Sequence, residues 1–241
     1  MNGGARREFG SGWLFRACER VWATVVLQFW TTAALVPSGL VAAALVPDVS
    51  NAPLYALAAL PVGPALAAAL HCGTLLTAGD DPAVGREFRR RWVSDARDVL
   101  AFWVPAVAVV TALLAGRALD PTGGTGPLGL VVAAGVLLWA AVMLVLVTAF
   151  SFRTRDAARL AVHVAVRFPG LTLVLLAVGA VLVAVSVTVG SWAAVGLLAV
   201  AAQVVAAAAG PARRAVRAEH TGHTEHTENP EGAEPAVPAG A

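Results

Sequence analysis

Charged residues are scarce in this chain. Asp, Glu, Lys and Arg make up 13% of its 241 residues, against about 25% in soluble domains. No lysine is present, so all 17 basic side chains are arginines, and the net charge of +2 is too small to indicate a nucleic-acid-binding protein. Hydrophobic residues make up 58% of the chain, which is more than one soluble core can bury. The composition therefore predicts a multi-pass protein of the cell membrane.

Residues for catalysis are also few. The two cysteines, Cys18 and Cys72, have no metal-binding or redox spacing and are interpreted as small buried or interfacial residues. No nucleophile elbow, phosphate loop or His-Glu metal motif is found, so we expect neither an enzyme, nor a metal site, nor a cofactor. Inside or directly before the predicted spans, the ionisable candidates are the two thiols and His71. His71 is interpreted as a hydrogen-bonded structural residue, the alternative being a proton relay or a substrate contact.

Long uncharged segments organise the chain. Each has about 18 or more residues, the length that a helix needs to cross a hydrocarbon layer of about 30 Å. The last uncharged segment, 171–210, has 40 residues, which is too long for one crossing. It must therefore form two spans with a tight turn near Gly190-Ser191. The sequence thus predicts an all-α transmembrane bundle of six helices. The predicted spans are 21–46, 53–77, 99–116, 128–150, 171–190 and 191–210.

The arginines predict the orientation of the bundle. Sixteen of the 17 fall in the two terminal segments and in alternate loops, and only Arg117 falls on the other side. The positive-inside rule then places both termini in the cytoplasm. We expect a cytoplasmic segment over residues 1–20, a membrane domain over 21–210, and a disordered tail over 211–241, since the tail has few large apolar residues. Its histidines (His220, His223 and His226) are interpreted as solvated, with zinc or nickel binding as the alternative.

Two prolines interrupt the second predicted span. Pro61 and Pro64 each remove a backbone donor and clash with the carbonyl four residues earlier, which belongs to Leu57 or Leu60. Freed carbonyls cannot face lipid, so the kink must face other helices or a wet cavity, and Gly63 allows a close approach there. A packing kink is the favoured interpretation, and a broken helix at a binding site is the alternative. The candidate ligand or helix-break residues are Leu57, Leu60, Pro61, Gly63, Pro64 and His71.

A cytoplasmic amphipathic helix is predicted near residues 82–98. Asp81 is a good N-cap, and Pro82 suits the first helical position. Phe88 and Trp92 share one face, whereas arginines occupy the others, a pattern typical of a helix on an anionic inner leaflet. Docking on a soluble partner is the alternative. The membrane-surface residues are Arg86, Phe88, Arg89, Arg90 and Trp92. The spacing of Glu87, Arg91 and Asp95 also allows a ladder of ion pairs.

Two stretches carry a resemblance to a known family. "GPALAAAL" followed by "DPAVGREFRRRW", and later "RDAARLAVHVAVRFPGLTLVLL", are similar to segments of the YesL-like bacterial membrane proteins. The resemblance covers roughly residues 21–210, and it departs at Gln28-Phe29-Trp30, where an Asn-Leu-Leu-Trp-like stretch is usual. It implies a polytopic membrane protein without an assigned activity, often encoded beside carbohydrate importers and glycan-degrading enzymes.

Two functional hypotheses remain. The first is an accessory or assembly protein linked to carbohydrate uptake or metabolism, with a sugar importer complex in the bilayer as its expected partner. The second is a small secondary carrier for a sugar-like or neutral solute, although no Asp or Glu lies inside any predicted span. A permease subunit of an ATP-driven importer is rejected: Asp156-Ala157-Ala158 resembles the Glu-Ala-Ala loop of such subunits, but Val162 stands where their glycine is expected.

Overall fold

The computed structural model describes residues 13–79, 83–120, 126–149 and 154–214. Every regular element in these ranges is a helix, which confirms the all-α prediction. Five of the described helical segments are long and apolar enough to cross a membrane. The fold is therefore that of a multi-pass membrane protein. Residues 211–214 of the predicted disordered tail are helical and Ala212 is buried, so the predicted start of the tail at residue 211 is wrong. The rest of the tail, with its three histidines, lies outside the described residues.

The first span is longer than predicted. Helix α1 runs from Trp13 to Ala44 and includes Pro37. It therefore begins eight residues before the predicted start at Val21, so part of the predicted N-terminal segment continues the spanning helix. A short 3-10 turn (Val49–Asn51) follows, where Asp48 accepts a hydrogen bond from the backbone N–H of Ser50.

The second span is broken where the prolines predict. Helix α2 covers Ala52–Ala59 and α3 covers Val62–Ala78. Helix α3 ends at Gly79, whose φ of 88° is left-handed and whose N–H bonds to carbonyls of the last turn. A glycine takes this conformation at little cost, which is why the helix ends there.

The predicted cytoplasmic helix 82–98 is divided in the structure. Helix α4 covers Val84–Ser94, and α5 begins at Ala96 and extends to Leu119. The two meet at Asp95, so the charged residues Arg97 and Asp98 belong to the first turn of α5. The predicted helix start, with Asp81 as N-cap and Pro82 in the first helical position, is wrong, because α4 begins at Val84 with Ala83 as its N-cap. Asp81 and Pro82 themselves lie outside the described residues.

Five helices are described in the second half of the chain. They are α6 (Gly126–Ala149), α7 (Thr154–Arg167), α8 (Pro169–Thr188), α9 (Ser191–Gly196) and α10 (Leu198–Ala208). The predicted turn between the last two spans is confirmed, because Gly190 separates α8 from α9 with a φ of 123°. The sixth predicted span, 191–210, is not one continuous helix but two short ones that meet at Leu197.

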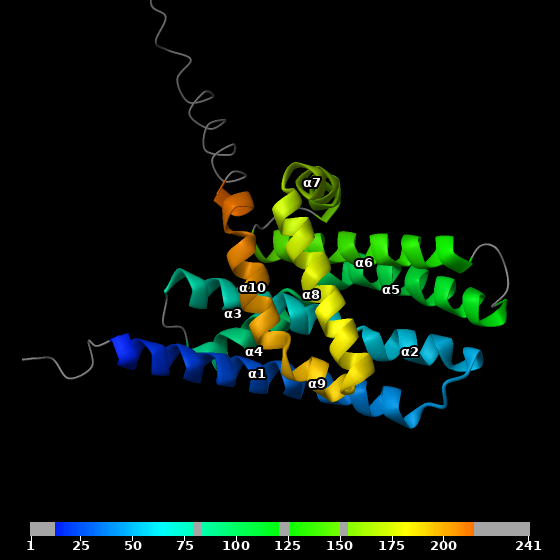
Figure 1. Cartoon of the computed structure of the whole chain (residues 1–241), viewed down its shortest axis with the longest axis horizontal. Coiled ribbons are helices and arrows are strands. Elements are labelled where there is room, and N and C mark those ends of the chain that lie inside the picture. Colours follow the sequence, from blue (N-terminus) through cyan, green and yellow to red (C-terminus); the bar gives the residue numbers. More distant parts are fainter. Residues whose placement is uncertain (1–12, 80–82, 121–125, 150–153, 215–241) are drawn as a thin grey trace, which may run out of the picture.

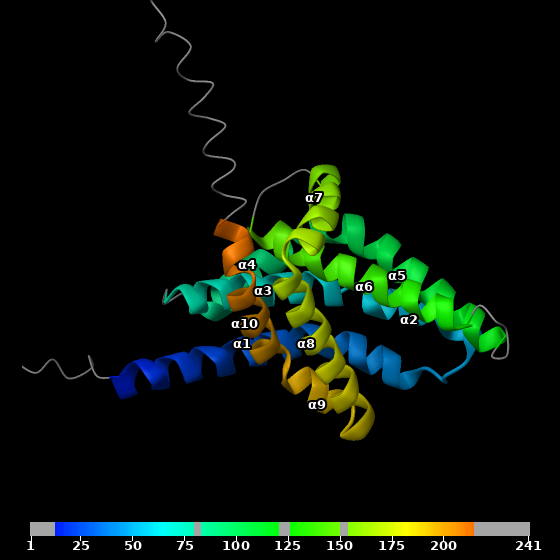
Figure 2. The same ribbon diagram turned by 45° about the horizontal axis from the view of Figure 1, so that its top comes forward.

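The long helices pack side by side. Helix α1, the α2–α3 pair, α5 and α6 run along a common direction, while α8 and α10 cross them obliquely (Figure 1). The turned view shows the same arrangement, with α7 at one end of α6 (Figure 2). Helix α3 is central, because it contacts α1, α4, α5, α6 and α10.

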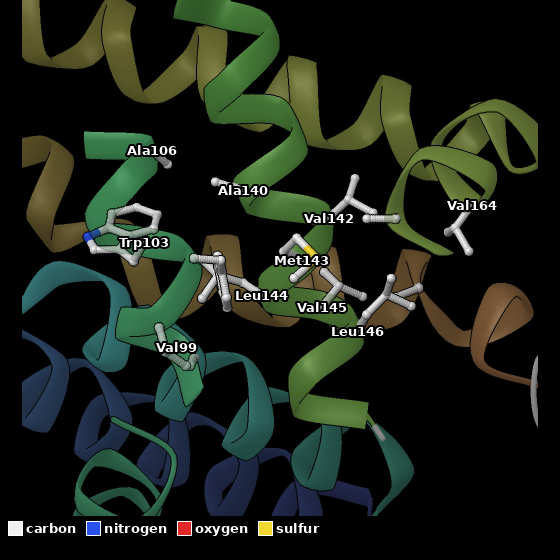
Figure 3. Packing of buried hydrophobic residues seen from close by; sticks show 14 of the residues in the cluster. Val99, Trp103, Ala106, Ala140, Val142, Met143, Leu144, Val145, Leu146 and Val164 are labelled. Atoms are coloured by element: carbon white, nitrogen blue, oxygen red, sulfur yellow. The ribbon is translucent and has the colours of Figure 1, made fainter. Parts of the chain in front are cut away.

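Two apolar clusters hold the bundle together. The larger joins α5 to α6 and α7, and Figure 3 shows Val99 and Trp103 of α5 near Met143 and Leu144 of α6. The smaller gathers side chains of α1, α3, α4 and α10 around Leu27 and Cys72. Only Leu171 among the large apolar side chains of α8 is buried, as expected for a helix that faces lipid.

Candidate functional site

The proline break is filled by a tryptophan side chain. The indole Nε1 of Trp103, on α5, donates a 2.9 Å hydrogen bond to the carbonyl of Ala59, the last residue of α2. This carbonyl lies where the helix is interrupted between α2 and α3, so its regular hydrogen bond to a backbone N–H of the next turn is disturbed. The bond satisfies it from a neighbouring helix rather than from a wet cavity.

Gly63 makes room for the same ring. A Cβ atom built at Gly63 would lie 2.6 Å from Cγ of Trp103, closer than any side chain can tolerate. The close approach predicted at this glycine is therefore confirmed, although the approaching group is an indole ring. Gly63 and Pro64 are buried, so the break faces the interior of the bundle.

The other predicted break residues have different surroundings. The carbonyl of Leu57 accepts a 3.2 Å hydrogen bond from the N–H of Leu60, so the prediction that Pro61 leaves it without a partner is wrong. Leu57 itself is 62% exposed. Leu60, Pro61 and Pro64 border an open, apolar groove together with Trp92 and Val93 of α4 and with the start of α5. His71 does not join them and lies in a separate cluster.

A second set of hydrogen bonds at a helix break joins α1 to the break between α9 and α10. Sequence reasoning missed it. The carboxamide of Gln28 donates a 2.7 Å hydrogen bond to the carbonyl of Val195 and accepts a 2.9 Å bond from the N–H of Ala199. It also donates to the hydroxyl of Thr32. One side chain thus pairs backbone groups on both sides of Leu197, as a peptide group of a continuous helix would.

His71 and Glu87 connect α3 to α4. Nε2 of His71 lies 3.2 Å from Oε1 of Glu87. Both side chains are largely buried, being 14% and 18% exposed. This supports the structural interpretation of His71, because its ring joins α3 to α4.

The predicted ladder of ion pairs is confirmed. Glu87 lies 3.4 Å from Arg91, and Arg91 lies 3.6 Å from Asp95. Arg90 adds two hydrogen bonds to Glu87, of 3.0 and 2.7 Å. These bonds, chiefly that from Arg90, lower the pKa of Glu87 below its ordinary value. Because the pKa is depressed, the carboxylate is fully charged above its ordinary pKa and loses its partners only when the pH falls through the lower value.

The aromatic face of α4 points into the bundle. Phe88 is 1% exposed and packs with Val84 in the smaller apolar cluster, and Trp92 is partly buried against it. Gly85 lets α4 approach the ring of Trp30 on α1. The prediction that Phe88 inserts into the leaflet is therefore wrong, because α1 and α3 already cover this face. Arg86, Arg89 and Arg90 remain exposed on the other side.

Arginines from three segments meet near the C-terminal half of α3. Arg20 of α1 donates a 3.0 Å hydrogen bond to the carbonyl of Leu76. Arg213, just after α10, donates a 2.6 Å bond to the hydroxyl of Thr74. Both complement the negative end of the α3 dipole, close to the charged helix α4. Arg20 of α1, the arginines of α4 and Arg213 thus lie on the side of the bundle where α3 ends.

A pocket of about 400 Å³ lies beside this end. Its lining residues are His71, Leu75, Ala83, Arg86, Glu87, Arg90 and Arg91. In the described ranges, no three His, Cys, Asp or Glu residues gather in a way that could hold a metal ion.

Comparisons of the chain with protein-family models, with curated proteins and with solved structures found no match. The resemblance to the YesL-like proteins thus stays a prediction from the quoted stretches.

Proposed function

We propose that this chain is an accessory or assembly protein of the cell membrane, acting through contacts with other components rather than through a catalytic centre. The observation that carries the proposal is that a side chain fills the break between α2 and α3. The indole of Trp103 occupies the space beside Gly63 and bonds to Ala59, where a carrier would need room for a solute. Carbohydrate uptake or metabolism is the proposed setting, based on the resemblance to the YesL-like proteins.

We further propose that α9 and α10 together make the sixth crossing, so that both termini lie in the cytoplasm. Gln28 supports this by pairing the backbone across the break at Leu197, as a pair of short helices in lipid requires. The convergence of arginines at the C-terminal half of α3 agrees with a single cytoplasmic end.

Cysteine labelling tests the orientation. In a background with Cys18→Ser and Cys72→Ala, a single cysteine at Ser50 should react with a membrane-impermeant maleimide in intact cells. A cysteine at Ala83, just before α4, should react only after the membrane is opened. Both positions are exposed, so accessibility to the reagent decides the result. Labelling of the Ala83 position in intact cells would reverse the assignment.

A transport experiment separates the accessory protein from the carrier. Deletion of the gene should lower uptake of at least one member of an oligosaccharide panel, while the purified protein in proteoliposomes should show no saturable uptake of the same sugar. Saturable uptake by the protein alone would favour a small secondary carrier for a sugar-like or neutral solute, which is the second candidate. A deletion without any uptake defect would contradict the link to carbohydrates.

A further inference from the structure

The pocket between α3 and α4 has the dimensions of a small-ligand site. Its volume of about 400 Å³ falls in the range of about 300–1,000 Å³ that is usual for ligand pockets. His71 and Leu75 of α3 form one wall, and the charged face of α4 forms the other. The pocket is therefore built on two helices that the His71–Glu87 contact holds together.

Positive charge dominates its lining. Three guanidinium groups, those of Arg86, Arg90 and Arg91, face one carboxylate, that of Glu87. The carboxylate is already engaged, since Arg90, Arg91 and His71 all lie within 3.4 Å of its oxygens. Its charge is thus compensated inside the cluster, and the remaining charge of the lining is positive.

Arg86 is the side chain best placed for a ligand. It is exposed and lies one helical turn before Arg90 on the same side of α4. Among the described residues it has neither an ion pair nor a hydrogen bond from its side chain. Arg90 uses Nε and Nη2 to hold Glu87, and its Nη1 has no partner in the same ranges. Two guanidinium groups can therefore donate hydrogen bonds into the pocket.

We propose that this pocket binds a phosphate group, with Arg86 and Arg90 as its ligands and Glu87 as the residue that positions Arg90. Planar guanidinium groups bind phosphate oxygens in pairs, which suits a site with two arginines one turn apart. The phosphate can belong to the headgroup of an anionic phospholipid or to a soluble phosphate ester. This inference does not depend on whether the protein assists an importer or carries a solute.

The test uses the full-length protein purified in a non-ionic detergent. Inorganic phosphate is titrated by calorimetry against wild type, Arg86→Gln and Arg89→Gln. Arg89 is the matched control, because it is an exposed arginine of the same helix that does not line the pocket. We expect phosphate to bind, its affinity to fall about tenfold in Arg86→Gln, and its affinity to change less than about twofold in Arg89→Gln. Melting temperatures of the two variants should agree, which excludes misfolding.

A second arm identifies the source of the phosphate. Native mass spectrometry compares retention of phosphatidic acid with that of phosphatidylcholine, and calorimetry compares glycerol phosphate with inorganic phosphate. Selective retention of phosphatidic acid that Arg86→Gln abolishes would assign a lipid headgroup, whereas tighter binding of glycerol phosphate alone would assign a soluble ester. Equal losses in Arg86→Gln and Arg89→Gln, or no binding of any phosphate, would overturn the proposal.

Discussion

Leucine in place of Gln28 is expected to lower the melting temperature of the purified protein in detergent by about 2–12 °C, equivalent to about 1–3 kcal/mol. Leucine is of similar size, so the change removes hydrogen bonds and little volume. The carbonyl of Val195 and the N–H of Ala199 would lose their partner at the break between α9 and α10. Backbone groups without partners are costly in lipid, so the two short helices should separate from α1 more easily.

Gln203 offers a matched control for this change. Within the part of the chain that the structure describes, its carboxamide makes one hydrogen bond, of 3.0 Å, to the hydroxyl of Thr24 on α1, and neither group is part of a helix break. Gln203→Leu should therefore cost less, near the average of about 0.6 kcal/mol for a hydrogen bond between helices in a membrane. Equal melting temperatures for the two variants would show that Gln28 does not act through the break.

The sequence predicts the long helices well because hydropathy and length act locally. The first five predicted spans correspond to helices that are long enough to cross, and the break at Pro61 falls where a missing N–H requires it. The ladder from Glu87 to Asp95 was equally predictable, since side chains four residues apart meet on any helix. The turn at Gly190 was predictable as well, because the uncharged run 171–210 is too long for one crossing.

The side chains that complete the two breaks could not be predicted. Gln28 and Val195 are separated by 167 residues, and Trp103 and Ala59 by 44, so only the packed bundle brings them together. The sequence did contain one signal, because Gln28 is a polar residue inside an apolar span and needs a partner there. The prediction for the aromatic face of α4 is wrong for a related reason. A stripe with Phe88 and Trp92 suits a membrane surface and a bundle interior equally, and contacts with α1 and α3 decide between them.

Alanine in place of Gly63 should destabilise the protein by about 1–3 kcal/mol, as extra volume in a packed interior does. The added methyl would meet three atoms of the Trp103 ring within 2.9 Å, and moving the ring would break its bond to the Ala59 carbonyl. Gly135 on α6 is the control, because a Cβ there meets nothing within 4 Å. Gly135→Ala should leave the melting temperature unchanged or raise it slightly, since alanine favours the helix.

A double-mutant cycle then tests whether the break between α2 and α3 serves packing or ligand binding. Trp103→Leu alone should also destabilise, because it leaves the Ala59 carbonyl unpaired and empties the space beside Gly63. If the ring and the glycine act as one packing unit, Gly63→Ala should cost much less in the Trp103→Leu background, with a coupling of about 1 kcal/mol or more. The uptake phenotype of each variant should follow its stability. A Gly63→Ala protein that melts like wild type but no longer complements the deletion would contradict the packing interpretation and place a ligand beside Pro61 and Pro64.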